Sequence, residues 1–416
     1  MKPAAPLALA AAFLLSFELQ ARAEWAVINL TPSTDSNSSV SSITGTQQAG
    51  YAGSPQHAGI WSGTAASFVD LEPAGAGDSR INATTGVQQA GGAFIGAVIH
   101  AIIWAGTAAS FTDLHPAGAA YSELYATTGS QQAGFASIGG NYHAGIWSGS
   151  AASFIDLHPS GATRSVVFST TGSQQAGYAT LSGHRHAGVW SGSAASFVDL
   201  HPSGATGSEL RATTGAQQAG FATINGADHA GIWSGTAASF VDLHPSGASD
   251  SLIHATTGSH QVGYATINGN THAGIWAGMA ASFTDLHALL PSNYDYSDAN
   301  TIWSDETTIM VAGLAYNHTT GWEEAVLWKY TPRVPKLAVT GKKKIVTDRA
   351  NIVVKGRAIG TVSSVTYKLG KSTRTANGTT AWKLTALLKP GRNTLTIIAH
   401  GPDGDSAPVK VVVTRK

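Results

Sequence analysis

Histidine and aspartate recur together through most of the chain and are the residues best suited to chemistry. Six segments read His-Ala-x-x-Trp and five read Asp-Leu-His. In Asp156-Leu157-His158 the carboxylate and the imidazole are expected on the same side of a strand, as a pair that could bind a metal. A pair repeated in every repeat is more simply a structural hydrogen bond, because buried Asp and His need partners wherever they occur. We therefore predict no metal site and no cofactor.

No catalytic motif stands out in the sequence. It contains no recognisable nucleophile motif, phosphate-binding glycine loop or zinc signature. The recurring aspartates fall on the outermost predicted strand of each repeat, far from a central channel, so they are poor candidates for paired-carboxylate hydrolysis. These residues are Asp70, Asp113, Asp156, Asp199, Asp242 and Asp285. We predict no catalytic residue.

The last repeat places aromatic side chains beside carboxylates. An aromatic face can stack on a sugar ring, and neighbouring oxygens can accept sugar hydroxyls or a hard cation such as calcium. This repeat could instead be irregular because it closes a ring of repeats. We select it as the ligand-binding site, with contacts from Tyr294, Asp295, Tyr296, Asp298, Trp322, Glu323 and Glu324.

The elements that position these residues follow a fixed period. Phenylalanine recurs every 43 residues from Phe68 to Phe283, and tryptophan keeps the same spacing from Trp61 to Trp276. Such a period indicates a repeat architecture. One repeat contains four strand-length runs separated by turn residues, at 209–215, 217–223, 229–233 and 237–243. Four short antiparallel strands per repeat predict the blade of a β-propeller, with both faces covered by neighbouring blades.

The two ends of the repeat region complete each other. Trp25–Leu30 lies one period before Phe68 and matches an outer strand, whereas the last repeat lacks one. Pairing them closes the ring and removes a sheet edge. The sequence thus predicts an all-β protein with a seven-bladed β-propeller over residues 24–330.

Two sets of loops vary between otherwise similar repeats. They precede the first strand, as at 76–80 and 162–165, and join the second strand to the third, as at 140–142 and 182–185. In a propeller both sets lie on one rim. Binding residues usually sit on loops held by a rigid scaffold, so we predict that this variable rim carries the ligand site.

The order of motifs in the repeats resembles that of bacterial extracellular HAF-type repeats. The shared order is His143-Ala144-Gly145-Ile146-Trp147, then Asp156-Leu157, then Gln174-Gln175-Ala176-Gly177. The chain departs from that pattern at the third position of the first motif, where glycine, or Ile102 in one repeat, replaces phenylalanine. The resemblance covers about residues 25–330. It implies a secreted repeat protein with no defined activity.

The C-terminal part, residues 331–416, has a different composition. It contains 17 Lys/Arg and 3 Asp/Glu, whereas residues 24–330 contain 5 and 20. Alternating β-branched runs separated by turns predict a β-sandwich. The segments 381–384 and 388–395 resemble the bacterial Ig-like modules appended to secreted proteins. The positive charge is either a solvated surface or a site for an anionic cell-surface polymer. Specific nucleic-acid binding is disfavoured because aromatic residues are sparse.

The N-terminus and the composition indicate the compartment. Residues 1–23 combine a charged start, an apolar run and Ala21-Arg22-Ala23, which predicts a secretory signal peptide. No transmembrane segment is predicted, and the chain has no cysteine. We expect a secreted or periplasmic monomer that acts as a non-catalytic binding, adhesion or structural protein for a carbohydrate or another cell-envelope ligand. The alternative is a carbohydrate-active hydrolase or lyase that uses the carboxylates of the last repeat.

Overall fold

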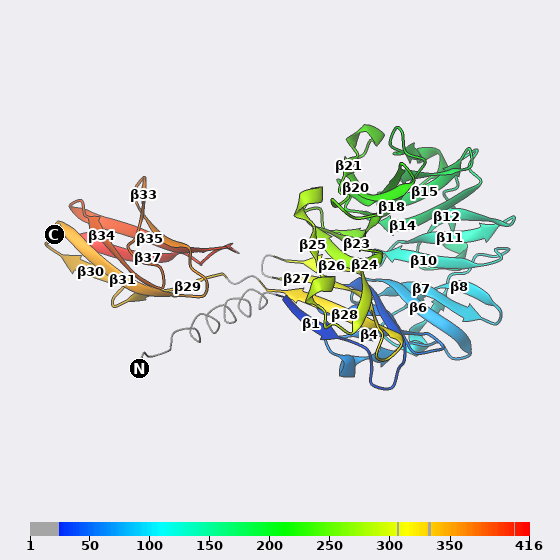
Figure 1. The fold of residues 1–416 in the computed structure, drawn as a ribbon, viewed down its shortest axis with the longest axis horizontal. Helices are drawn as coiled ribbons and strands as arrows, with labels where there is room; N and C mark the ends of the chain where they lie inside the picture. Colours follow the sequence, from blue (N-terminus) through cyan, green and yellow to red (C-terminus); the bar gives the residue numbers. More distant parts are fainter. Residues whose placement is uncertain (1–24, 306–307, 332–333, 403) are drawn as a thin grey trace, which may run out of the picture. The chain divides into compact units, whose positions relative to one another are not determined.

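The structure is a computed structural model that describes residues 25–305, 308–331, 334–402 and 404–416. The predicted signal peptide at 1–23 lies outside these residues. Backbone contacts divide the described chain into two units, Trp25–Tyr330 and Thr331–Lys416 (Figure 1). Among the described residues, no helix is long and apolar enough to cross a membrane.

The unit Trp25–Tyr330 consists of seven antiparallel sheets of four strands each, which we number 1 to 7 in chain order. Sheet 1 contains β2 (Ser38–Ile43), β3 (Gln48–Ala52), β4 (His57–Trp61) and β5 (Val69–Asp70). Sheet 2 contains β6 (Ala76–Thr84), β7 (Gln89–Ile95), β8 (Val98–Trp104) and β9 (Thr112–Asp113). Sheet 3 contains β10 (Ser122–Thr127), β11 (Gln132–Ile138), β12 (Asn141–Trp147) and β13 (Ile155–Asp156). Sheet 4 contains β14 (Arg164–Thr170), β15 (Gln175–Leu181), β16 (His184–Trp190) and β17 (Val198–Asp199). Sheet 5 contains β18 (Gly207–Thr213), β19 (Gln218–Ile224), β20 (Ala227–Trp233) and β21 (Val241–Asp242). Sheet 6 contains β22 (Ser251–Thr256), β23 (Gln261–Ile267), β24 (Asn270–Trp276) and β25 (Thr284–Asp285).

Sheet 7 joins the two ends of this unit. It contains β26 (Tyr294–Ser304), β27 (Ile309–Asn317), β28 (Trp322–Tyr330) and the N-terminal β1 (Trp25–Asn29). The strands β1 and β28 pair antiparallel, with Trp25 opposite Tyr330 and Asn29 opposite Val326. Each sheet contacts the next, and β26 and β27 of sheet 7 contact β2 of sheet 1. The predicted pairing of the first strand with the last repeat is therefore present.

The outermost strand of each repeat is shorter than the sequence predicts. The sequence predicts one strand over 237–243, but Ala237–Ser239 form a 3-10 turn and only Val241–Asp242 pair as β21. The Ser239 hydroxyl accepts a hydrogen bond from the Ser234 amide at 2.8 Å and donates one to the Thr236 carbonyl at 2.6 Å, which closes the turn. Hydroxyl side chains compete with strand pairing in this way. Equivalent 3-10 turns lie at Ala65–Ser67, Ala108–Ser110, Ala151–Ser153, Ala194–Ser196 and Ala280–Ser282, with a further one at His287–Leu289.

The outer strand also corrects the prediction that both faces of every strand are covered. Val241 is 45% exposed and Asp242 is exposed as well, whereas Leu243 directly after them is fully buried. The side chains of this two-residue edge strand face water, and only the following leucine reaches the core.

The core lies between successive sheets and is built around the recurring tryptophans. Trp190 of sheet 4 is 0% exposed and packs with Ala144 and Leu157 of sheet 3. Buried aromatic side chains each remove about 150–250 Å² from water, worth about 4–6 kcal/mol before entropy costs. The tryptophans are therefore core residues, as the sequence predicts.

One repeat packs differently because it has lost a glycine. A Cβ on Gly231 would lie 2.1 Å from the Phe240 ring, so glycine lets that ring cover the strand and rest against Trp233 at 4.9 Å. In sheet 2 the same place is occupied by Ile102, which is fully buried, and Phe111 is 36% exposed. The isoleucine fills the space that the phenylalanine ring uses in the other repeats.

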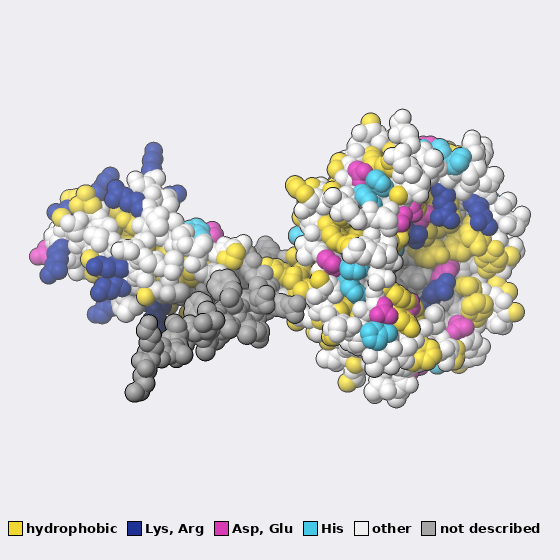
Figure 2. All heavy atoms as spheres, in the orientation of Figure 1, with side chains coloured by type: hydrophobic (Ala, Val, Ile, Leu, Met, Phe, Trp, Pro, Cys, Tyr) yellow, Lys and Arg dark blue, Asp and Glu magenta, His cyan; other side chains and the backbone are white. Residues whose placement is uncertain are grey.

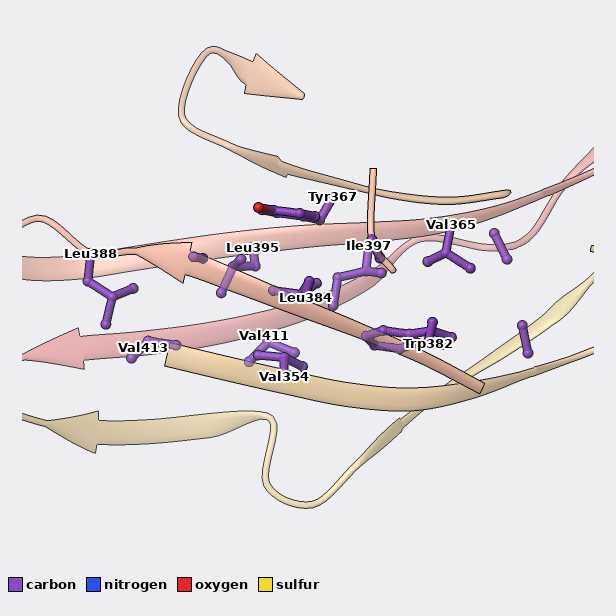
Figure 3. Packing of buried hydrophobic residues seen from close by; sticks show 14 residues of the cluster. Val354, Val365, Tyr367, Trp382, Leu384, Leu388, Leu395, Ile397, Val411 and Val413 are labelled. Atoms are coloured by element: carbon purple, nitrogen blue, oxygen red, sulfur yellow. The ribbon is translucent and has the colours of Figure 1, made fainter. Parts of the chain in front are cut away.

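The unit Thr331–Lys416 contains two sheets around one core. The first sheet has the order β29 (Lys336–Thr340), β31 (Asn351–Ile359) and β34 (Ala381–Leu387). The second has the order β30 (Lys344–Thr347), β37 (Val409–Arg415), β35 (Gly391–Gly401), β32 (Ser364–Leu369) and β33 (Ser372–Thr375), with β36 (Gly404–Asp405) paired to β35. Residues of β34 alternate between exposed and buried, so Trp382 and Leu384 enter the core and meet Val365 and Ile397 of the second sheet (Figure 3).

Candidate functional site: an aromatic–arginine patch on the variable rim

The recurring histidines and aspartates form hydrogen bonds that link neighbouring strands and sheets. His143 Nδ1 lies 2.8 Å from Asp156 Oδ2, and the other carboxylate oxygen accepts the His158 amide at 2.8 Å. The His158 ring lies between the Ser165 hydroxyl, 2.8 Å from Nδ1, and the Ala162 carbonyl, 2.9 Å from Nε2. No group of three or more His, Asp or Glu side chains in the described part of the chain is arranged to hold a metal.

The seven residues selected in the last repeat do not form one site. Glu323 and Glu324 are consecutive residues of β28, so their side chains project from opposite faces of sheet 7. Tyr294 bonds to Glu324, whereas Tyr296 bonds to Glu323. The carboxylates are thereby divided between the two faces.

Glu324 is a structural residue. It is 6% exposed, and one carboxylate oxygen accepts hydrogen bonds from the Tyr294 hydroxyl at 2.6 Å and Asn29 at 2.7 Å. The other accepts from Asn317 at 3.0 Å and Thr320 at 2.9 Å. Burial and the bond to Glu324 raise the pKa of Tyr294 above its ordinary value. These contacts attach β1 to the rest of sheet 7.

The Glu323 side carries the more accessible groups. The Tyr296 hydroxyl donates to Glu323 at 2.9 Å, and the Tyr296 ring stacks on Tyr316 at 5.2 Å with an interplanar angle of 3°. Burial, together with the bond to Glu323, raises the pKa of Tyr296 to about 12. This cluster presents parallel aromatic rings beside a partly exposed carboxylate.

The remaining selected residues lie apart from this cluster. Asp295 pairs with His318 at 2.7 Å, and both side chains are about half exposed. Asp298 Oδ2 lies 3.1 Å from His254 Nε2 of sheet 6, and both are partly buried. Trp322 is 45% exposed.

A second cluster occupies the variable rim of sheets 3 to 5. We call it the aromatic–arginine patch, and it comprises Tyr121, Tyr125, Phe135, Tyr142, Arg164, Phe168, Tyr178, Arg185 and Arg211. Four of these residues come from the segments that the sequence predicts as variable loops. Tyr121 directly precedes β10, but Tyr142, Arg164 and Arg185 lie in the first two residues of β12, β14 and β16, because these strands extend further than the sequence predicts. The others come from the first two strands of their sheets.

The aromatic side chains of the patch form a continuous set of contacts. Tyr142 packs on Phe135 at 4.5 Å and meets the edge of Tyr121 at 5.5 Å. Tyr125 contacts Phe168 of the next sheet at 5.0 Å. Offset and edge-to-face ring pairs of this kind each add about 0.5–1.5 kcal/mol beyond area burial, so these rings hold one another in place.

Each arginine of the patch lies over an aromatic ring. The guanidinium carbon of Arg164 is 4.6 Å from the centre of Tyr142, that of Arg185 is 4.9 Å from Tyr178, and that of Arg211 is 4.3 Å from Phe168. All three distances lie within the cation–π range. Figure 2 shows dark blue side chains beside yellow surface around the central hollow of this unit. This concentration is notable because the unit has only 5 Lys/Arg.

A buried glutamate holds two of the three patch arginines, Arg185 and Arg211, and a second one holds Arg80 nearby. Glu209 is fully buried and lies 2.9 Å from Arg185 and 2.6 Å from Arg211, whose side chains are 54% and 30% exposed. Arg80 of sheet 2 makes two hydrogen bonds, at 2.7 and 2.9 Å, to the buried Glu123. Burial raises the pKa of Glu209, and the two arginines oppose that rise. The guanidinium groups of Arg185 and Arg211 are thus oriented by Glu209 and remain partly open to solvent.

The sequence did not predict the aromatic–arginine patch. A signal was available two positions before the near-constant Thr-Thr-Gly turn segment, where the residue changes from Tyr125 to Phe168 to Arg211 at a spacing of 43 residues. Variation at one position of a repeated strand marks a place where the repeats differ in role.

Comparisons with known proteins identify no family. No family model matches the chain, and no curated protein matches it. The chain is similar to the tricorn protease over 89% of this chain and 44% of that one, with 8% identity and a TM-score of 0.40. It is similar to TolB from Acinetobacter baumannii over 76% of this chain and 82% of that one, with 9% identity and a TM-score of 0.38. A third similarity is to the fibronectin(III)-like modules of Clostridium thermocellum CbhA. It covers 19% of this chain and 95% of that one, with 20% identity and a TM-score of 0.17. The chain thus spans less than half of the tricorn protease, and likeness at these levels says nothing about activity.

Proposed function

We propose that this chain is a secreted, non-catalytic binding protein whose aromatic–arginine patch recognises an acidic carbohydrate. In this proposal Trp25–Tyr330 is a seven-bladed β-propeller of the HAF-repeat type, and Thr331–Lys416 is an Ig-like module. Seven four-stranded sheets, with sheet 7 in contact with sheet 1, support the propeller assignment. Two facing sheets around one core support the second assignment.

The single observation that carries the ligand class is the stacking of three partly exposed arginines on aromatic rings. Aromatic faces pack against the apolar faces of sugar rings, and guanidinium groups pair with carboxylates in a bidentate manner. A ligand with sugar rings and carboxylate groups satisfies both surfaces. Glu209 is buried and paired with Arg185 and Arg211, and Glu123 is buried and paired with Arg80, so neither carboxylate faces such a ligand unpaired.

The test is binding of oligogalacturonates, with neutral galactan oligomers as the comparison. Arg164→Gln should weaken oligogalacturonate binding about tenfold, the loss expected for one charge-assisted contact. Tyr142→Ala should also weaken it, because it removes the ring on which Arg164 and a sugar could stack. Lys329→Gln is the matched control, because it removes the remaining cation of the unit at an exposed position on β28. Equal binding by all three variants, or equal binding of neutral and acidic oligomers, would refute the proposal.

Of the residues selected in the last repeat, Tyr296 and Glu323 remain a candidate second contact. They lie on the first and third strands of sheet 7. The pKa of Tyr51 in sheet 1 is raised first by burial and then by the charge of Glu323. If this cluster acts as a hydrolase or lyase site instead, the protein should release sugar fragments from a polysaccharide, and Glu323→Gln should abolish that release. Fragment release that depends on Glu323 would replace the binding role with the catalytic one.

A further inference from the structure

The C-terminal unit contains a groove whose lining carries positive charge without any negative charge. Its volume is about 810 Å³, within the range of sites that hold ligands of several rings. Lys371 and Arg374 come from β33 and the turn before it, and Lys389 and Arg392 come from the turn between β34 and β35 and the start of β35. No Asp or Glu is among the described residues that line it.

Among the residues that the structure describes, the four cations have no carboxylate partners. In the described part of this unit, an ion pair joins His400 to Asp405 at 2.6 Å, and it includes none of the four groove cations. All four groove cations are exposed. Surface charges of one sign on both walls of a groove focus the electrostatic field and attract an oppositely charged chain. Figure 2 shows many dark blue and few magenta side chains on the visible face of this unit.

The groove is built on a rigid floor. Tyr367 is 5% exposed, and its hydroxyl donates to the Thr385 carbonyl of β34 at 3.0 Å, which links the two sheets beneath the groove. The turn on one wall is held by Asn393, which accepts from the Lys389 amide at 3.0 Å and donates to the Lys389 carbonyl at 2.8 Å. The cations therefore project from a fixed frame.

The lining also narrows the class of ligand. The unit's two aromatic residues of the kind that stack on bases, Tyr367 and Trp382, are 5% and 2% exposed, so neither offers a stacking face to a single-stranded nucleic acid. The edge strands β33 and β34 each contribute two residues to the lining, which leaves little continuous backbone for an added peptide strand. A chain that carries its anions on flexible, hydroxyl-rich units fits these walls better.

We propose that this groove binds a linear acidic polysaccharide through Lys371, Arg374, Lys389 and Arg392. This site is separate from the aromatic–arginine patch and does not depend on it. The contact is mainly ionic, so the affinity falls as salt rises and neutral polysaccharides do not compete.

The test uses the full chain carrying Arg164→Gln, so that the patch is impaired, with polygalacturonate immobilised as the probe. Replacing the four groove cations by glutamine should weaken binding at least about 30-fold, since four exposed charge contacts are lost together. The matched control replaces four exposed cations elsewhere on this unit, Lys336, Lys344, Lys355 and Lys383, and therefore has the same net charge. It should lose less than about threefold.

Equal losses in both quadruple variants would show that binding follows net charge and would overturn the groove. Tighter binding of single-stranded DNA or poly-glutamate than of polygalacturonate would overturn the ligand class. Loss of binding in Arg164→Gln alone, with no further effect of the groove variant, would place the polysaccharide on the patch only and refute this second site.

Discussion

The imidazole of His143 lies face to face with that of His158, with 4.0 Å between ring centroids and an interplanar angle of 12°. His143 is paired with Asp156, whereas both ring nitrogens of His158 are committed to neutral hydrogen bonds. The bond from Nε2–H to the Ala162 carbonyl leaves Nδ1 to accept from the Ser165 hydroxyl, so His158 is held as the neutral form. Stacked or tilted pairs recur at His100/His115, His186/His201, His229/His244 and His272/His287.

These pairs predict that acid destabilises the repeat unit. Burial lowers the pKa of His158, and the same cause lowers the pKa of His115, His201 and His287 below the ordinary 6.5. A histidine whose pKa is depressed by folding binds its proton more readily when unfolded, so its contribution is present above pH 6.5 and is lost as the pH falls toward the lowered value. The melting temperature should therefore fall between pH 7 and pH 5, with four sites acting together.

A matched variant isolates one site. Glutamine can accept from Ser165 and donate to Ala162 without titrating, so His158→Gln should show a shallower fall in melting temperature below pH 6.5 than the parent chain. Sheet 1 is a natural comparison, because Glu72 occupies the equivalent place and bonds to Ser79. An identical pH profile for the variant and the parent would contradict this account.

The buried Glu209 predicts an asymmetry between the two partners of an ion pair. Removing Arg211 leaves a fully buried carboxylate with Arg185 as its remaining cation, whereas removing the charge of Glu209 leaves two arginines that reach solvent. We expect Arg211→Gln to lower the free energy of unfolding by about 2–3 kcal/mol and Glu209→Gln by about 1 kcal/mol or less.

The pH dependence of the stability of Arg211→Gln tests whether charge burial causes its loss of stability. Loss of Arg211 removes a cause that lowers the pKa of Glu209, so this pKa rises further in the folded state. A carboxyl whose pKa is raised by folding lowers the free energy of unfolding when it is ionised, and this loss disappears when it is protonated. The difference in melting temperature between Arg211→Gln and the parent should therefore be smaller at pH 4.5 than at pH 7, and a constant difference would argue against charge burial as the cause.

Replacing either of two glycines of one repeat by alanine should lower the free energy of unfolding by very different amounts. A Cβ on Gly220 would lie 1.9 Å from the Glu209 carbonyl oxygen, which is backbone of the paired strand, whereas a Cβ on Gly231 would meet the Phe240 ring, which can rotate away. Overpacking costs about 1–3 kcal/mol where side chains can adjust and more where they cannot. Chemical denaturation should show Gly231→Ala within that range and Gly220→Ala beyond it. The exposed Phe111 beside Ile102 already shows that the ring can leave. Comparable costs for both substitutions would refute the distinction.

The sequence predicted what repeats and missed what the repeats build together. The 43-residue period, the turn residues and the degenerate strand at Trp25–Leu30 were enough to predict four strands per repeat and the pairing of β1 with β28. The 3-10 turn at Ala237–Ser239 was missed because its cause is a hydroxyl bonded to its own backbone, which apolar alternation does not reveal. The patch was missed because Tyr125, Phe168 and Arg211 lie 43 residues apart and meet only when neighbouring sheets pack.

The closure of sheet 7 by β1 predicts a specific failure when that strand is absent. Leu30 is fully buried, its amide donates to the Ala325 carbonyl at 2.8 Å, and it packs in a cluster with Val40 and Trp61 of sheet 1. Deleting residues 25–30 uncovers the backbone edge of β28, and exposed strand edges recruit other chains. We expect the truncated protein to melt at a lower temperature and to aggregate, as followed by light scattering, whereas a chain that begins at residue 25 should behave as the parent. A synthetic peptide covering residues 25–37 should bind the truncated protein and suppress aggregation, because it restores the missing strand. A truncated chain that stays monomeric and keeps its melting temperature would show that β1 is not needed for closure.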